Sequence, residues 1–143
     1  MWYDALEVAR YIITRCYTLG KPVSNLKLQK MLYFILVDFY RRTHRRLFME
    51  DVCAWQFGPV VPKVYYEFCS YAGMAINSIY PTEIVQDDRE MLDDIINQYI
   101  DIPVNILVAR THERGTAWDA IYQNGSGKRK IIPFHLIIEK ETA

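Results

Sequence analysis

The sequence has few of the residues that interrupt regular structure, with six glycines and six prolines among 143 residues. Hydrophobic residues make up 51% of the chain and charged residues 24%. This profile excludes an intrinsically disordered chain and is typical of a compact globular protein. A chain of this length buries about 68–70% of the surface that it exposes when unfolded. We therefore predict one domain spanning residues 1–143.

An excess of charge of one sign is also missing, because 17 lysines and arginines balance 17 aspartates and glutamates. The balance excludes an overall basic surface for nucleic acid or an anionic membrane. Two local basic runs remain, at Arg41–Arg46 and Lys128–Lys130, and both offer groups that bind phosphate. A nucleic-acid-binding regulator stays as an alternative. We favour a solvent-facing helix end for the first run and a charged strand edge for the second.

Long apolar runs are absent, since no stretch of 18 residues is free of charge. The first residues lack the cationic start and apolar run of a signal peptide, so we expect a soluble, cytoplasmic protein that does not insert into a membrane. The three cysteines, Cys16, Cys53 and Cys69, form no C-x-x-C pair. We expect small buried hydrophobic residues rather than disulfides or zinc ligands.

None of the common catalytic motifs occurs, including the phosphate-binding glycine loops, the hydrolase elbow and the zinc-protease helix. The three histidines are widely spaced, and we expect no metal and no cofactor. Cys69 with His112 as a base would make a nucleophilic pair if the fold brought them together. The pairs Asp87–Asp88 and Asp93–Asp94 are the alternative acid/base groups, although they suit the wet face of a helix. We predict that the chain is not an enzyme and keep a small Cys/His- or carboxylate-dependent enzyme as an alternative.

Apolar residues recur at helical spacing over most of the chain. The segment 26–40 is apolar on nearly every face, which predicts a helix in the middle of the domain. Asp87 with Glu90, and Thr116 with Asp119, resemble capping signatures. Helical patterns cover seven segments, and from them we expect about six helices. The segments are residues 4–19, 26–40, 62–72, 87–99, 103–112, 116–122 and 133–140.

Two segments favour extended structure. Residues 47–57 lack helical periodicity, and residues 128–132 follow a turn signal at Asn124–Gly127. We expect Gly58-Pro59 to end the first strand with a turn that brings a buried Trp55 next to the following helix. The predicted fold class is therefore mainly α, with one short β element.

Three blocks of sequence carry a family resemblance: Asn25–Phe34, Ala54–Phe68, and Thr111–Arg114 with Trp118. In order and spacing they resemble the Panacea domain, the SocA-like antitoxin domain found in phage-associated GepA-type proteins. The resemblance covers nearly the whole chain, and the second block is its most specific part. It implies an antitoxin that neutralises a toxin encoded by an adjacent gene, with delivery of that toxin to a cellular protease as a further role. A homodimer is left open.

The motif positions have the character of framework residues, and for one scaffold that serves unrelated toxins we expect them to hold the fold. We expect Gln29, Lys30 and His112 to satisfy backbone groups or other side chains. Tyr66 and Tyr80 are the candidate partner-binding residues, with a packing role as the alternative. The motif positions are Leu28, Gln29, Lys30, Leu32, Tyr33, Ala54, Trp55, Gly58, Pro59, Val60, Pro62, Tyr65, Thr111, His112 and Trp118.

Overall fold

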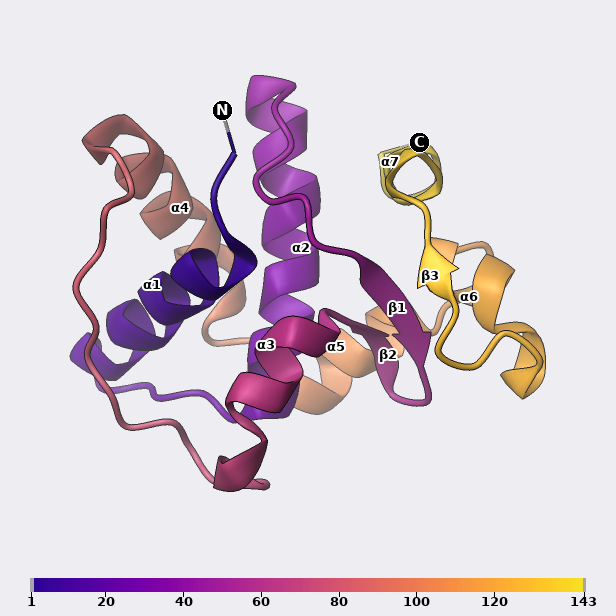
Figure 1. Ribbon diagram of the computed structural model, residues 1–143, viewed down its shortest axis with the longest axis horizontal. Coiled ribbons are helices and arrows are strands. Elements are labelled where there is room, and N and C mark those ends of the chain that lie inside the picture. The colour runs from indigo at the N-terminus through magenta and orange to yellow at the C-terminus, as the bar shows by residue number, and fades with distance from the viewer. Residues whose placement is uncertain (1, 143) are drawn as a thin grey trace.

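The computed structural model describes residues 2–142 and contains seven α-helices and three strands within them (Figure 1). The prediction of a mainly α fold with a minor β element is confirmed. Each of the seven segments with a helical pattern corresponds to one of these helices, so the observed number is one more than the expected count of about six. The elements are α1 (Ala5–Thr18), α2 (Asn25–Thr43), β1 (Val52–Trp55), β2 (Gly58–Val60), α3 (Pro62–Glu67), α4 (Gln86–Tyr99), α5 (Val104–Thr111), α6 (Ala117–Tyr122), β3 (Ile131–Ile132) and α7 (Phe134–Glu141), with 3₁₀ turns at Cys69–Tyr71 and Gln123–Gly125.

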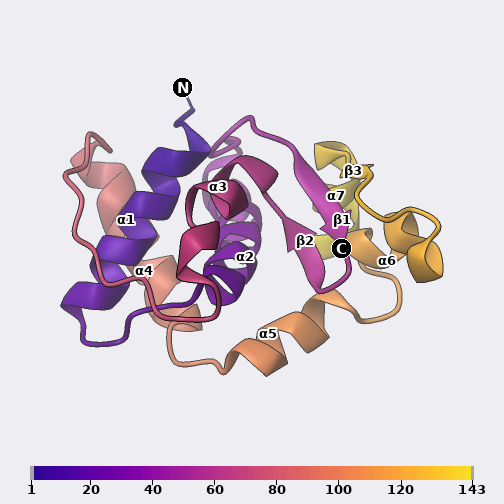
Figure 2. The same cartoon turned by 60° about the horizontal axis from the view of Figure 1, so that its bottom comes forward.

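Helix α2 runs through the centre of the molecule, as its apolar sequence predicts. Helices α1 and α4 lie on one side of it, and the sheet with α6 and α7 lies on the other (Figure 1). Helix α5 contacts both α2 and β2 and runs below them toward the sheet (Figure 2). The Ser24 hydroxyl accepts the Lys27 N–H at the start of α2, and His44 ends the helix in the left-handed conformation.

The sheet is antiparallel with the order β2-β1-β3. The prediction that Gly58-Pro59 forms the turn is wrong: Gln56 and Phe57 form it, and Gly58 and Pro59 are the first residues of β2. Proline is tolerated there because β2 is an edge strand. The predicted outcome of the turn holds, since the Trp55 and Tyr65 ring centroids are 4.9 Å apart. The second extended segment forms β3, which pairs with the other edge of β1.

Several helix boundaries differ from the prediction; α2, for example, ends at Thr43 and not at residue 40. Helix α4 begins at Gln86 and has no side-chain cap, so Asp87 is not its N-cap. The neighbouring Asp88 is buried, and its carboxylate accepts hydrogen bonds from Tyr3 and Arg45 instead of facing solvent. The helix expected over 62–72 ends at Glu67, because the backbone of Phe68 leaves the helical conformation to bury its ring.

The basic run Arg41–Arg46 faces solvent only in part: Arg41, Arg42 and His44 are exposed, as expected, whereas Arg45 and Arg46 are partly buried. Arg46 donates to three consecutive backbone carbonyls and covers the ring of Phe134. The other three arginines pair with carboxylates spread over two helices: Arg41 with Asp38, Arg42 with Asp94 and Arg45 with Asp88.

Cys16 and Cys53 are buried, as expected, whereas Cys69 is exposed because its 3₁₀ turn lies beyond the end of α3. Within residues 2–142, no helix combines the length and the hydropathy needed to cross a membrane.

Candidate protein-binding site

Two adjacent side chains of α2 close the outer edge of β2. The Gln29 Oε1 atom accepts the Val61 N–H at 3.0 Å, and the Lys30 Nζ atom donates to the Pro59 carbonyl at 2.8 Å. Both side chains are buried, and the Gln29 amide also donates to Asn25 Oδ1 at 3.1 Å. The expectation that these two residues satisfy backbone groups is confirmed. They supply the acceptor and the donor that a further strand would otherwise bring to this edge.

Gly58 explains why the three motif blocks meet at one point. A Cβ atom at this position would lie 2.7 Å from Thr111 Oγ1 and 2.9 Å from Lys30 Cε, and the backbone φ is +112°. Only glycine combines that conformation with so close an approach. Burial lowers the pKa of the Lys30 ammonium from its usual value to about 7.

His112 and Trp118 hold the other side of the hairpin. The two ring nitrogens of His112 lie 2.7 Å from the Val108 carbonyl oxygen and 3.0 Å from that of Gln56. The imidazole packs against the Trp118 ring, whose N–H donates to the Trp55 carbonyl at 2.7 Å. The third block therefore fixes the last residue of β1, Trp55, and the first residue of the turn, Gln56.

The nucleophile and base of the enzyme alternative are not joined in this structure. The Cys69 thiol donates to the Tyr66 carbonyl, and both nitrogens of His112 face backbone carbonyls. No hydrogen bond links Cys69 to His112 within residues 2–142. Within the same range, no three His, Cys, Asp or Glu side chains are grouped in a way that could hold a metal ion.

The remaining motif positions form the framework around the hairpin. Pro62 opens α3, and Tyr33 extends from the core to donate its hydroxyl to Glu141 at 3.0 Å. The others are buried in the elements where the sequence places them: Leu28 and Leu32 in α2, Ala54 and Val60 in the sheet, Thr111 in α5 and Trp118 in α6.

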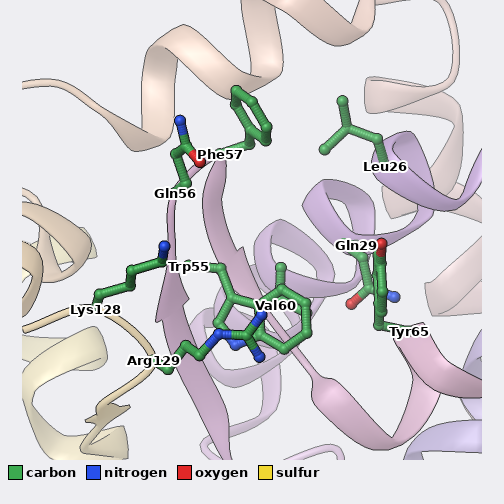
Figure 3. A pocket seen from close by; sticks show the side chains of 9 residues that line it. All are labelled: Leu26, Gln29, Trp55, Gln56, Phe57, Val60, Tyr65, Lys128 and Arg129. Carbon is green, nitrogen blue, oxygen red and sulfur yellow. The ribbon is translucent and has the colours of Figure 1, made fainter. Parts of the chain in front are cut away.

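A hollow of about 240 Å³ lies between the hairpin, the start of α2, α3 and the segment before β3 (Figure 3). Trp55, which we expected in the core, is only partly buried and lies at its centre. The Arg129 guanidinium covers the Trp55 ring at 4.4 Å from the centroid and donates to the Tyr66 hydroxyl at 3.4 Å. The lining residues are Leu26, Gln29, Trp55, Gln56, Phe57, Val60, Tyr65, Lys128 and Arg129.

Large apolar side chains around this hollow are open to solvent. Phe57 is 59% exposed, Tyr66 57% and Leu26 37%. We call the surface formed by Leu26, Trp55, Phe57, Tyr65 and Tyr66 the hairpin face. Its aromatic residues are of the kinds that are enriched in protein interfaces.

The two tyrosines proposed from the sequence do not share a hollow. Tyr66 belongs to the hairpin face, where its ring centroid lies 5.9 Å from that of Trp55. Tyr80 is partly buried in another hollow, under the Arg10 guanidinium, with its backbone N–H bonded to Thr14. Tyr80 thus has the packing partners that the sequence did not reveal.

Comparison with known proteins matches residues 28–119 to the family model described as antitoxin SocA-like, Panacea domain. Antitoxin SocA of Caulobacter vibrioides (strain NA1000 / CB15N) is 33% identical over 137 residues, which cover 87% of this chain and 72% of that protein. No solved structure matches. The matched region contains the hairpin and the α2 and α5 residues that hold it. From the family model and the relative together, the chain belongs to the SocA-like antitoxin family, the Panacea domain proteins.

Proposed function

We propose that this protein is an antitoxin that neutralises a toxin, encoded by an adjacent gene, by binding it through the hairpin face. The observation that carries the proposal is the cluster of exposed Leu26, Phe57 and Tyr66 around the Trp55–Arg129 pair. Binding energy concentrates in such aromatic and arginine anchors. Family membership supplies the antitoxin role, and the cluster supplies a surface on which a partner would be held.

In this proposal the framework residues hold the hairpin in place, and the exposed residues contact the partner. Gln29, Lys30 and Gly58 fix the hairpin, while Phe57 and Tyr66 project from it. Exposed positions on a rigid support change without cost to the fold. The same scaffold would therefore serve toxins of different kinds.

Growth rescue tests the proposal. We expect Phe57→Ser together with Tyr66→Ala to abolish both rescue of cells that express the adjacent toxin and co-purification of the complex. The matched control is Val85→Ser, which removes an exposed apolar side chain outside the hairpin face and should leave rescue unchanged. Circular dichroism shows first that each variant is folded. Full rescue by the double variant would refute binding through this face.

The proposed mechanism needs no catalytic group. A folded variant with Cys16, Cys53 and Cys69 changed to alanine and His112 to glutamine should still neutralise the toxin. Loss of rescue in that variant while the complex still forms would place the enzyme alternative first. Toxin half-life, measured with and without the antitoxin, separates occlusion from delivery to a protease, because only delivery shortens it.

A further inference from the structure

Two cationic side chains and a free indole N–H are among the polar groups that face the hollow of the hairpin face. The Trp118 indole N–H is bonded to a carbonyl, but the Trp55 indole N–H has no acceptor among residues 2–142. Lys128 and Arg129 reach toward Trp55 from one side (Figure 3), and no carboxylate lines the hollow. The Gln56 carboxamide and the Tyr65 hydroxyl offer neutral acceptor oxygens, but the lining holds no anionic acceptor for its two cations.

Positive charge is uncompensated at this place. Within residues 2–142 the ion pairs engage arginines and lysines elsewhere, and neither Lys128 nor Arg129 takes part in one. The basic run at the end of α2, by contrast, is paired with Asp38, Asp88 and Asp94. The two cations at the hollow are therefore available to a partner.

Arg129 is held in place by its backbone. Its φ is +67°, an uncommon value for a residue other than glycine, and its N–H donates to the Ala54 carbonyl at 2.6 Å. Strained backbone of this kind persists where the surrounding structure fixes it, and it is concentrated at functional sites. The anchoring next to β1 sets the guanidinium over Trp55, with one N–H on the Tyr66 hydroxyl.

The walls and the volume of the hollow indicate what else a ligand needs besides an anionic group. Leu26, Phe57 and Tyr65 offer apolar surface, and the volume of about 240 Å³ lies below the usual range for drug-sized ligands, about 300–1,000 Å³. This space suits one apolar side chain and the group next to it. A nucleic acid base is a poorer fit, because Arg129 already covers a face of Trp55 and the chain carries no net positive charge.

We propose that the hollow binds a segment of a partner protein in which a carboxylate side chain lies next to an apolar one. The carboxylate accepts from Arg129, Lys128 and the Trp55 indole, and the apolar side chain packs against Leu26, Phe57 and Tyr65. The inference rests on the proposed function, since it describes the part of the toxin that the hairpin face recognises.

The test uses the full chain labelled with ¹⁵N and two acetylated hexapeptides. One alternates leucine with glutamate, and its twin has glutamine in place of each glutamate. The reporter is the Trp55 indole N–H resonance, identified by its loss in Trp55→Phe. We expect the glutamate peptide to bind at least tenfold more tightly than its twin. That difference should disappear in Arg129→Gln and shrink as salt is raised.

Arg10→Gln is the matched control, because Arg10 also lies over an aromatic ring, that of Tyr80, but in another hollow. The tenfold preference should remain in this variant. Equal binding of the two peptides to the parent, or tighter binding of oligothymidylate than of the glutamate peptide, would overturn the inference. Growth rescue of toxin-expressing cells that depends on Phe57 and Tyr66 but not on Arg129 would also overturn the inference. The proposed function would then still stand. The opposite separation is also possible. If the protein binds the glutamate peptide selectively but does not rescue cells that express the toxin, the inference is supported and the proposed function fails.

Discussion

The buried Lys30 ammonium lies 2.8 Å from the carbonyl oxygen of Pro59, and this helix-to-strand contact joins two of the three motif blocks. No carboxylate within residues 2–142 pairs with it. A lysine buried in this way makes the folded state sensitive to pH, because burial disfavours the charged form.

Lys30→Met should change how stability depends on pH. Burial lowers the pKa of Lys30 from 10.5 to about 7 in the folded protein. Between these values the unfolded chain holds a proton that the folded protein has released, so the free energy of unfolding of the wild type rises with pH. Relative to Lys30→Met, it should rise by about 1.4 kcal/mol per pH unit across this window.

Urea unfolding of the two proteins at several pH values from 6 to 10 measures this difference. Below pH about 7 lysine is protonated in both states, so the difference should be flat there. Parallel curves for the two proteins above pH 7 would mean that Lys30 keeps its proton in the folded state.

Gly58→Ala should destabilise the protein by about 3 kcal/mol. One part of this loss comes from the positive φ, and the other from overpacking of the added methyl group against Lys30 and Thr111. Gly20→Ala separates the two contributions, because Gly20 has φ +73° and no atom within 4 Å of the added Cβ. We expect it to cost only the conformational part, about 1–2 kcal/mol. Chemical denaturation of both variants gives the comparison, and equal losses would show that Gly58 has room for a methyl group.

Gln29→Leu should expose the role of the Gln29 carboxamide at the sheet edge. The change leaves the buried Val61 N–H without an acceptor, which costs about 1–3 kcal/mol. Hydrogen exchange adds a local readout, since the Val61 amide should exchange faster relative to amides in α4. Unchanged protection of Val61 would mean that another acceptor replaces Gln29.

Arg45→Gln should cost more than Arg42→Gln, although both residues belong to one basic run. The Arg45 partner, Asp88, is 4% exposed, and leaving a buried carboxylate without its cation should cost about 2–4 kcal/mol. The Arg42 partner, Asp94, is largely exposed, so that loss should stay below about 1 kcal/mol. Thermal melts rank the two variants, and the reverse order would show that Asp88 finds another donor.

Local signals in the sequence predicted much of the helical fold. The apolar spacing of residues 26–40 identified the central helix, and Thr116 caps α6 by accepting the Asp119 N–H, as its position indicates. These features depend on residues within one or two turns of each other. The first and third motif blocks likewise identified residues that are buried in the structure.

Features that depend on distant segments were not predictable in this way. The inward turn of Asp88 depends on Tyr3 and Arg45, which lie 85 and 43 residues away. Strand β2 contains Gly58 and Pro59, a pair that is typical of turns. That Gly58 lies in a strand follows only from its contacts with Lys30 and Thr111, which are distant in the sequence. Likewise, the run Lys128–Lys130 reads as a charged strand edge, and only the pairing of Arg129 with Ala54 shows that it reaches Trp55.

That pairing also joins two segments that are synthesised at different times. The hairpin that carries Trp55 leaves the ribosome early, but its hollow is open on one side until Arg129 has been synthesised. At translation rates of about 5–20 residues per second, the intervening chain takes roughly 4–15 s to make. During that interval the nascent chain displays aromatic side chains without the arginine that covers them. Under the proposed function, the surface that would bind a toxin is complete only after this delay.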